Sequence, residues 1–308
     1  ANNMALNTVE AAKIFQTALD KKVEKQLTSA WMEVPSNFVQ YDGGDEVKLP
    51  SIVVDGLGNY DRDGGYTVGG VTLSWNTYKL TQDRGRAFLL DAMMVNETNF
   101  ILTATNVMDE FQRTQVVPEI DAYRYSKLAA VAKSENTTAK SYTKPDELYS
   151  AIKKDIAKLQ DAGVDFGNII LTISAGALST LEESEMAARR MNYTKLDDGE
   201  VGGRILKIGD VEVNVVPQNR LVTEIQVNDG KTSGQEKGGW AKASSAKDIN
   251  YILCPKDAPQ AVTKQDIIRI FSPEQNQKAN AWSIDYRRFH DLWVPESKKS
   301  LVIVSTTA

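Results

Sequence analysis

The spacing of hydrophobic and polar positions changes several times along the chain, and each spacing predicts an element. Between residues 8 and 29 apolar side chains recur at helical intervals with charged residues between them, which predicts an amphipathic helix. Its apolar positions are Ala12, Phe15, Leu19, Val23 and Leu27. This helix either docks on its own domain or forms an arm that docks on a neighbouring copy, and the pattern leaves both readings open.

A long β-hairpin is predicted over residues 46–82. The segment 46–57 is β-rich, and Pro50 favours an edge strand because proline has no N–H to donate. Residues 56–70 are dense in Gly, Asn and Asp and predict a turn, after which 71–82 return. Each arm has about ten residues, or about 33 Å at ~3.3 Å per residue. An isolated hairpin is marginal in water, so we expect it to lie on a wider sheet of its own domain or on an adjacent subunit.

The returning strand of this hairpin contains a change of phase. Val71, Leu73 and Trp75 alternate, and the apolar positions then move to Tyr78 and Leu80. A phase change inside a strand is typical of a bulge or a sharp twist, which we expect near residues 76–77.

The longest helical pattern covers residues 96–132. Pro118 interrupts it, and we expect the helix to kink or restart there, with Glu119 and Asp121 in the new first turn. The polar residues 133–143 then predict a linker.

The second half of the chain alternates strands and helices. A helix is predicted at 145–162, closed by Gly163, and a tight hairpin at 204–217 turns around Gly209-Asp210. The other predicted segments are a buried strand at 168–174, a helix at 176–191, an exposed loop at 228–246, a strand at 249–255, a helix-capable segment at 258–271, and β-segments at 280–294 and 300–306. The order of elements predicts an α+β protein.

Composition narrows the function. The chain has 308 residues with a net charge of −5, which is unusual for a protein that grips nucleic acid, so DNA nearby is expected to be enclosed without tight binding. No segment reaches the roughly 18–20 apolar residues of a membrane span.

One cysteine and one histidine restrict the possible chemistry. Cys254 excludes an intrachain disulfide and CxxC zinc sites, and it is predicted to be an inert buried thiol. His290 excludes HExxH sites and would have to carry any catalytic triad alone, so a structural role is favoured. No nucleotide-binding or hydrolase motif is present. We expect no cofactor, no metal and no catalytic residue.

The charged group Asp83-Arg84-Gly85-Arg86 allows two readings. It could bind phosphate, because arginine makes bidentate contacts to oxyanions. A turn with an ion-pair network is the favoured reading, since such clusters are structural as often as functional.

The segments in order resemble the major capsid proteins of tailed bacteriophages of the Hong Kong 97 type. The resemblance is carried by LSWNTYKLTQDRGRAFLLD (73–91), EFQRTQVVPEIDAYRYSKLA (110–129) and DYRRFHDLWVPESKKSLVIVST (285–306). It implies an N-terminal arm (1–42) and an extended loop (43–90). It also implies a peripheral domain with a long spine helix (91–143, completed by 278–308) and an axial α/β domain (144–277).

The resemblance also implies how the chain acts. Copies would assemble as pentamers and hexamers into an icosahedral virion shell in the host cytoplasm, with a portal and a separate or already removed scaffolding protein, because no long helical scaffold precedes the arm. The loops 228–246 and 192–203 would meet near the symmetry axes. The candidate subunit contacts are Phe15, Leu19, Val23, Asn59, Tyr60, Asp61, Arg62, Trp75, Arg84 and Arg86. Two alternatives are an encapsulin-like nanocompartment shell and, remotely, a carboxylate-dependent hydrolase.

Overall fold

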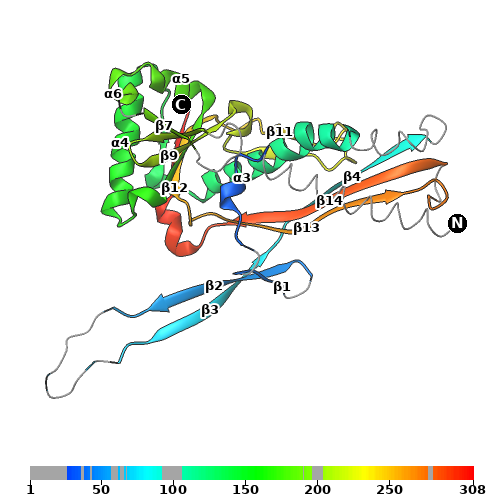
Figure 1. Ribbon diagram of the computed structural model, residues 1–308, viewed down its shortest axis with the longest axis horizontal. Coiled ribbons are helices and arrows are strands. Elements are labelled where there is room, and N and C mark those ends of the chain that lie inside the picture. Colours follow the sequence, from blue (N-terminus) through cyan, green and yellow to red (C-terminus); the bar gives the residue numbers. More distant parts are fainter. Residues whose placement is uncertain are drawn as a thin grey trace.

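The computed structural model describes residues 26–35, 38–41, 44–56, 62, 66, 68–91, 106–189, 191–195, 204–276 and 280–308. Figure 1 shows an elongated molecule with a helix-covered sheet at one end, a long narrow sheet with α3 reaching toward the other end, and a hairpin that projects away from both. Most of the predicted helix at 8–29 and most of the hairpin tip lie outside the described residues.

The helix-covered sheet, here called the β6 sheet, is built around a fully buried strand. Its described strands run in the order β5 (Thr137–Ala139), β15 (Ile303–Thr306), β12 (Ile249–Pro255), β6 (Ile169–Ser174), β9 (Val211–Val216), β8 (Arg204–Ile208) and β7 (Met191–Lys195). The apolar stripe of α4 (Pro145–Asp161) joins β6 in one core through Leu148, Ile152 and Leu159. Gly163 follows α4 with a φ of 85°, which suits a helix end. The strand, helix and hairpin predicted at 168–174, 145–162 and 204–217 are confirmed.

The helix predicted at 176–191 is two helices, α5 (Ala175–Glu182) and α6 (Glu185–Ala188). The break comes at Ser184, whose hydroxyl accepts a hydrogen bond from the Ala187 amide at 3.4 Å and so caps a new helix. Ser174 caps α5 in the same way, with its hydroxyl 3.2 Å from the Ala177 nitrogen.

The long narrow sheet, here called the β14 sheet, contains β13 (Gln260–Phe271), β14 (Ala281–Trp293) and β4 (Gln82–Asp91), all antiparallel. The helix-capable reading of 258–271 is therefore wrong. The segment is rich in β-branched residues, which favour strands, and Ile268 and Ile284 are buried in one core. A register shift between Thr263 and Gln265 lets β13 follow β14 along its whole length. The β14 sheet thus takes in residues 260–271, from the range that the resemblance assigned to an axial domain.

The spine helix passes through Pro118 without a break. Residues 106–111 are α-helical, a π-helical turn (η3, Gln112–Val116) follows, and α3 (Val117–Val131) continues from it. Pro118 cannot donate the usual backbone hydrogen bond, and its ring crowds the carbonyl of the preceding turn. The widened turn before it relieves this conflict, so the predicted restart becomes a local change of helix type.

The hairpin is confirmed as two nine-residue strands, β2 (Glu46–Val54) and β3 (Val71–Lys79), with the short β1 (Gln40–Tyr41) beside β2. The remaining described elements are η1 (Ala30–Met32), η4 (Ser134–Asn136), η5 (Phe166–Asn168), η6 (Gln218–Arg220), β10 (Ile225–Val227), β11 (Trp240–Lys242) and η7 (Glu296–Leu301).

Candidate functional site

The half of the hairpin nearest the body packs onto the molecule through one face. Val47 and Leu49 of β2 are buried, and Tyr78 of β3 stacks on Trp293 with the ring centroids 5.1 Å apart. Neighbouring segments complete this small core with Val39, Leu80, Val262 and Phe289. The root of the hairpin is therefore held by the chain's own side chains.

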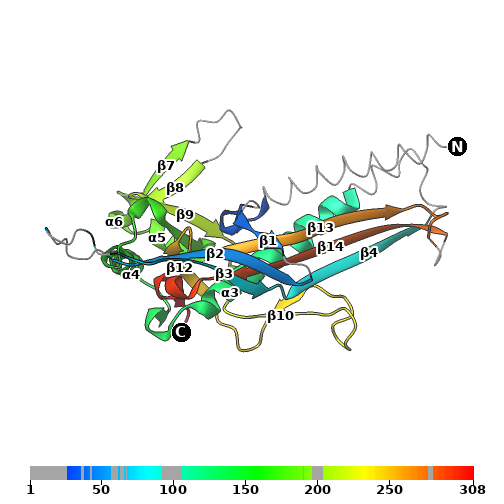
Figure 2. The same cartoon turned by 90° about the horizontal axis from the view of Figure 1, so that it is seen from below.

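In the distal half the apolar side chains lie on the opposite face and are exposed. Ile52 is paired with Leu73, and Val54 with Val71, so the four side chains share one face. Their exposed fractions are between 60% and 70%. With the next pair toward the root they form the distal apolar strip: Pro50, Ile52, Val54, Val71, Leu73 and Trp75. Figure 1 shows this part of the hairpin extending away from the body, and Figure 2, seen from below, shows β2 and β3 in front of it.

This exchange of faces explains the phase change in the sequence. The pairing runs without a register shift from Glu46–Lys79 to Val54–Val71, so the predicted bulge near residues 76–77 is absent. The apolar positions change phase because the two halves of the strand face different surroundings. Tyr78 faces the body, whereas Leu73 faces outward.

The predicted contact residues are spread over several places. Trp75 lies in the distal apolar strip and Arg62 is exposed in the tip region. Arg84 and Arg86 lie in β4. The others fall outside the described residues: Phe15, Leu19, Val23, Asn59, Tyr60 and Asp61.

Arg84 binds parts of its own chain. It lies in a strand instead of the expected turn, and its Nε is 2.6 Å from Oε1 of Glu119 on α3. Its Nη1 and Nη2 also donate to the backbone oxygens of Asn228 and Gly239, at 2.7 and 3.1 Å. The expected ion-pair network is therefore present in β4, and Arg84 clamps the loop 228–239 onto the β14 sheet.

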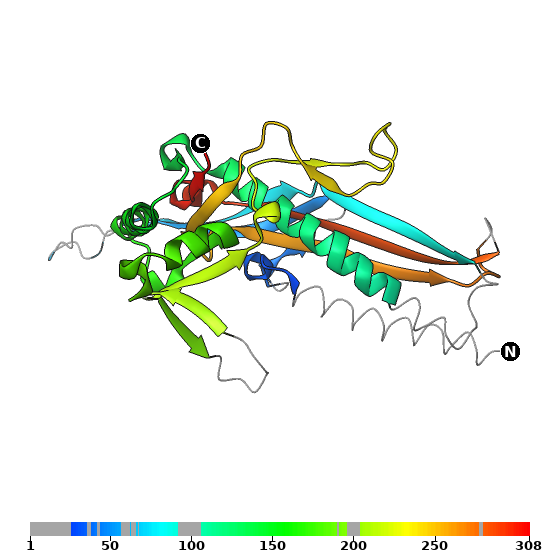
Figure 3. The same cartoon turned by 90° about the horizontal axis from the view of Figure 1, so that it is seen from above.

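The loop 228–239 lies away from the strands β7 and β8 (Figure 3). Arg86 donates to the Lys237 oxygen at 3.3 Å, which adds a second contact between β4 and the loop. Figure 3 shows the β10–β11 region beside α3 and β4, whereas β7 and β8 leave the other side of the molecule. Residues 196–203 lie outside the described residues, so the expected meeting of 228–246 with 192–203 near the symmetry axes stays a prediction.

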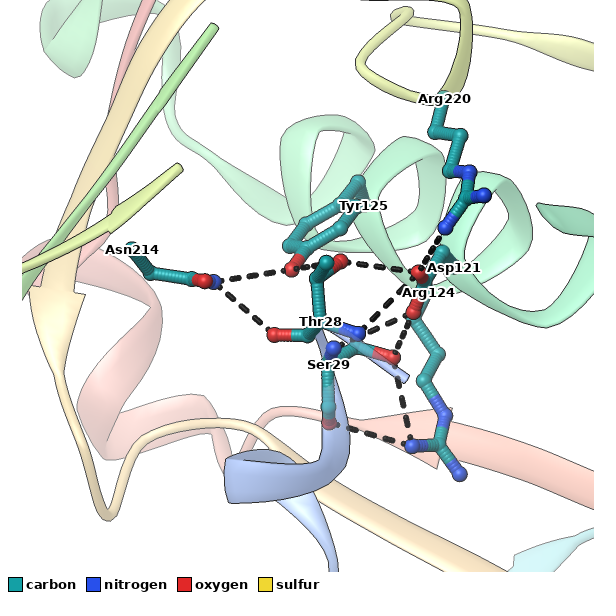
Figure 4. Close-up of polar contacts among 7 residues, drawn as sticks. All are labelled: Thr28, Ser29, Asp121, Arg124, Tyr125, Asn214 and Arg220. Atoms are coloured by element: carbon teal, nitrogen blue, oxygen red, sulfur yellow. Dashed lines mark hydrogen bonds and ion pairs between the residues drawn. The ribbon is translucent and has the colours of Figure 1, made fainter. Parts of the chain in front are cut away.

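A buried carboxylate holds the segment that precedes η1. Asp121 of α3 is fully buried and accepts hydrogen bonds from both the amide and the hydroxyl of Thr28 and of Ser29, at 2.6–3.2 Å (Figure 4). Nη1 of Arg220, from η6, lies 3.2 Å from the same carboxylate. One carboxylate thus satisfies the donors of a turn and of a side chain from another part of the fold.

The next turn of α3 continues this polar cluster. Arg124, fully buried, donates to the Ser29 backbone oxygen at 3.1 Å and binds Glu33 at 2.6 Å. Burial lowers the pKa of the Arg124 guanidinium, and Glu33 opposes that shift. The amide of Asn214, from β9, donates to the Thr28 oxygen at 2.9 Å (Figure 4).

Sequence reasoning missed these residues as a group. Asp121, Arg124 and Tyr125 follow the i, i+3, i+4 spacing that places side chains on one helix face. Their partners Thr28 and Ser29 lie more than 90 positions away in sequence. The only local signal was polar residues on a helix face that is otherwise buried.

Two groups with possible chemistry are enclosed. Burial lowers the pKa of His290 well below its usual value, and the cations of Arg288, Arg124 and Lys127 add to the shift. The Nδ1 of His290 has no hydrogen-bond partner, whereas a triad histidine needs this nitrogen bonded to a carboxylate. Burial raises the pKa of Cys254 to about 12, which keeps it a thiol.

A cavity of about 400 Å³ between α3, β4, β14 and the loop 228–239 contains two acids, Glu119 and Asp229. Glu119 is paired with Arg84. Asp229 accepts hydrogen bonds from Lys231 and Thr232 of its own loop, and these lower its pKa to about 2. Both carboxylates are thus bound by other groups of the same chain. Within the described part of the chain no cluster of His, Cys, Asp or Glu could hold a metal ion, and no helix is long and apolar enough to cross a membrane.

Comparisons with known proteins give the fold. No protein-family model matches the chain, and no curated protein matches it either. A capsid structure of Cyanophage P-SCSP1u is similar over 87% of this chain and 85% of that chain, with 11% identity and a TM-score of 0.54. A capsid structure of Staphylococcus phage Andhra is similar over 90% of this chain and 83% of that chain, also with 11% identity and a TM-score of 0.54. A virus-like particle from Pyrococcus furiosus covers 96% and 98%, with 9% identity and a TM-score of 0.52. The predicted α+β class is confirmed, and the chain has the fold of these capsid and virus-like-particle structures.

Proposed function

We propose that this chain is the major capsid protein of a tailed bacteriophage. Copies self-assemble through pentamers and hexamers into an icosahedral shell that encloses double-stranded DNA. The role is structural, with no catalytic step. Scaffolding protein and portal are the further partners of this proposal.

The distal apolar strip carries the proposal. A nine-residue strand spans about 30 Å at ~3.3 Å per residue, so the strip extends well beyond the core that holds the hairpin root. Contiguous exposed apolar patches of this kind mark interaction sites. We assign a second copy of the chain as the occupant, since a repeated contact of this type closes a shell from identical units. Each contact can be weak, because many act together once the shell begins to close.

The domain proposal follows the sheets. The peripheral domain combines α3 with the β14 sheet and so includes residues 260–271. The axial domain is the β6 sheet with its helices, to which the short strands at 137–139 and 303–306 belong. The extended loop is the β2–β3 hairpin.

Substitution in the strip tests the proposal. Leu73→Asp places a charge at a position that is 60% exposed in the single chain, and Thr72→Asp places the same charge on the opposite face of the strand. The purified chains, with and without a co-expressed scaffold, are examined by electron microscopy and native mass spectrometry. We expect particles from wild type and Thr72→Asp, and folded but unassembled Leu73→Asp. Normal particles from Leu73→Asp would refute the role of the strip. A wild-type chain that stays monomeric under every assembly condition would refute the shell.

A nanocompartment shell that holds a protein cargo is the second candidate, and the similarity to the virus-like particle from Pyrococcus furiosus favours it. Gene neighbourhood separates the two: terminase and portal genes indicate the phage, and a peroxidase or ferritin-like gene indicates the compartment. A carboxylate-dependent hydrolase has less support, because the two acids of the described cavity are engaged by Arg84 and by the loop itself.

A further inference from the structure

The segment 28–34 contacts α3, the β6 sheet side and the β14 sheet within seven residues. On α3 it meets Asp121, Arg124 and Tyr125, the last of which donates to the Thr28 hydroxyl at 3.1 Å. Thr28 and Ser29 therefore lie against α3, on the side that also meets Asn214 and Arg220 (Figure 4).

The same segment meets both sheets. From the β6 sheet side, Asn214 binds the Thr28 oxygen and Arg220 shares the carboxylate that holds Thr28 and Ser29. Toward the β14 sheet, Val34 donates its amide to the Ala261 oxygen at 3.0 Å, and Glu33 forms an ion pair with Arg288 at 3.5 Å. The segment is thus bonded to α3, to β9 and η6, and to β13 and β14.

We propose that Thr28–Val34 and Asp121 form a buried polar joint that locks the β6 sheet and the β14 sheet into one rigid body. The physical reason is the buried charge. A rotation between the sheets that withdrew Arg220 would take the cation away from the fully buried Asp121 carboxylate, and one that withdrew Asn214 would break the hydrogen bond to the Thr28 backbone oxygen; both losses are costly. Both oxygens of the buried Asp121 carboxylate accept hydrogen bonds in this arrangement, which favours it over others. This inference concerns the single chain and does not depend on the proposed function.

Asp121→Asn tests the joint with little change in volume. Its amide group would place two donors against the Arg220 guanidinium and the Thr28 and Ser29 donors, so the cluster cannot be satisfied. The matched control is Glu119→Gln, two residues earlier on α3. It removes the ion pair of Glu119 with Arg84, at 2.6 Å, and so loosens the loop 228–239, which Arg84 binds, while the joint stays intact.

Two readouts on the unassembled chain decide the outcome. Spin labels on Lys153→Cys of α4 and Arg269→Cys of β13, both exposed positions, report the distance between the sheets, while the buried Cys254 stays unlabelled. We expect Asp121→Asn to broaden the distance distribution and to raise hydrogen exchange of the Thr28 and Ser29 amides about tenfold or more. Glu119→Gln should leave both unchanged and raise exchange at the Asn228 amide, which bonds Gly239 in the loop.

A milder variant covers the case in which Asp121→Asn does not fold. Asn214→Ala with Arg220→Gln cuts only the link to the β6 sheet, so the distance distribution should broaden while the Thr28 and Ser29 amides remain protected by Asp121. A distribution as narrow as wild type in this variant overturns the joint, as does equal broadening in Glu119→Gln. Failure to form particles bears on the shell and leaves these readouts intact.

Discussion

At the residue scale, the sole histidine is held neutral by its surroundings. His290 packs edge-on against Tyr123, with ring centroids 5.7 Å apart, and the cations of Arg288, Arg124, Lys127 and Arg84 act on it. Burial first, and these cations second, lower its pKa in the folded state. The unfolded chain, with a His pKa of about 6.5, then binds the proton first as pH falls. The free energy of unfolding therefore decreases below about pH 6.5.

We expect this one group to cost about 1.4 kcal/mol between pH 7.5 and about pH 5.5. His290→Gln keeps a polar side chain but cannot titrate, so its stability should decrease less over the same interval. Urea unfolding at several pH values measures the difference, and no other histidine complicates it. Parallel pH profiles for the two proteins would show that His290 is accessible to protons in the folded chain.

At the element scale, the two halves of the hairpin should respond differently to the same substitution. Leu49→Ala opens a cavity in the core at the root, where Leu49 is buried, and should cost about 2–5 kcal/mol. Leu73→Ala removes an exposed side chain and should change monomer stability by about 0.5 kcal/mol or less, while it weakens assembly. Chemical unfolding of the monomer and particle yield by electron microscopy measure the two effects. Equal loss of stability in both variants would mean that the strip packs on its own body.

The elements that the sequence predicted well are those whose period arises from one environment. The stripe of α4 and the buried run of β6 each face a single core, so pattern and structure agree. The strand β3 changes environment halfway, because its apolar side chains move from one face to the other while the register stays the same. In the sequence alone this looks the same as a bulge. The segment 258–271 was ambiguous because its pairing with β14 comes from residues that follow later in the chain. Asp121 was read only as a helix-start residue, because its partners lie more than 90 positions earlier.

At the scale of the whole molecule, charge should keep the chain from binding DNA tightly. The net charge is −5, whereas non-specific binding draws its affinity from cations that neutralise phosphates. Proteins that grip DNA in this way reach a Kd of about 10⁻⁴–10⁻⁶ M at physiological salt. We expect fluorescence anisotropy with duplex DNA to show no binding at about 10 μM chain and 0.15 M salt. A Kd near 10⁻⁶ M that weakens steeply with salt would contradict an enclosing role without a grip.

Assembly from many copies should convert a small change in one contact into a large change in threshold. Trp75 is 40% exposed in the single chain and is the aromatic member of the distal apolar strip, and aromatic residues commonly dominate interfaces. Each copy contributes one hairpin, so a loss of about 1.4 kcal/mol in its contact enters once per subunit and raises the critical concentration about tenfold. Light scattering over a series of chain concentrations should show this shift for Trp75→Ala. Thr72→Ala, on the opposite face, should assemble at the wild-type threshold because it leaves the strip intact. If Trp75→Ala also assembled at the wild-type threshold, the contact between copies would have to lie on another surface of the hairpin.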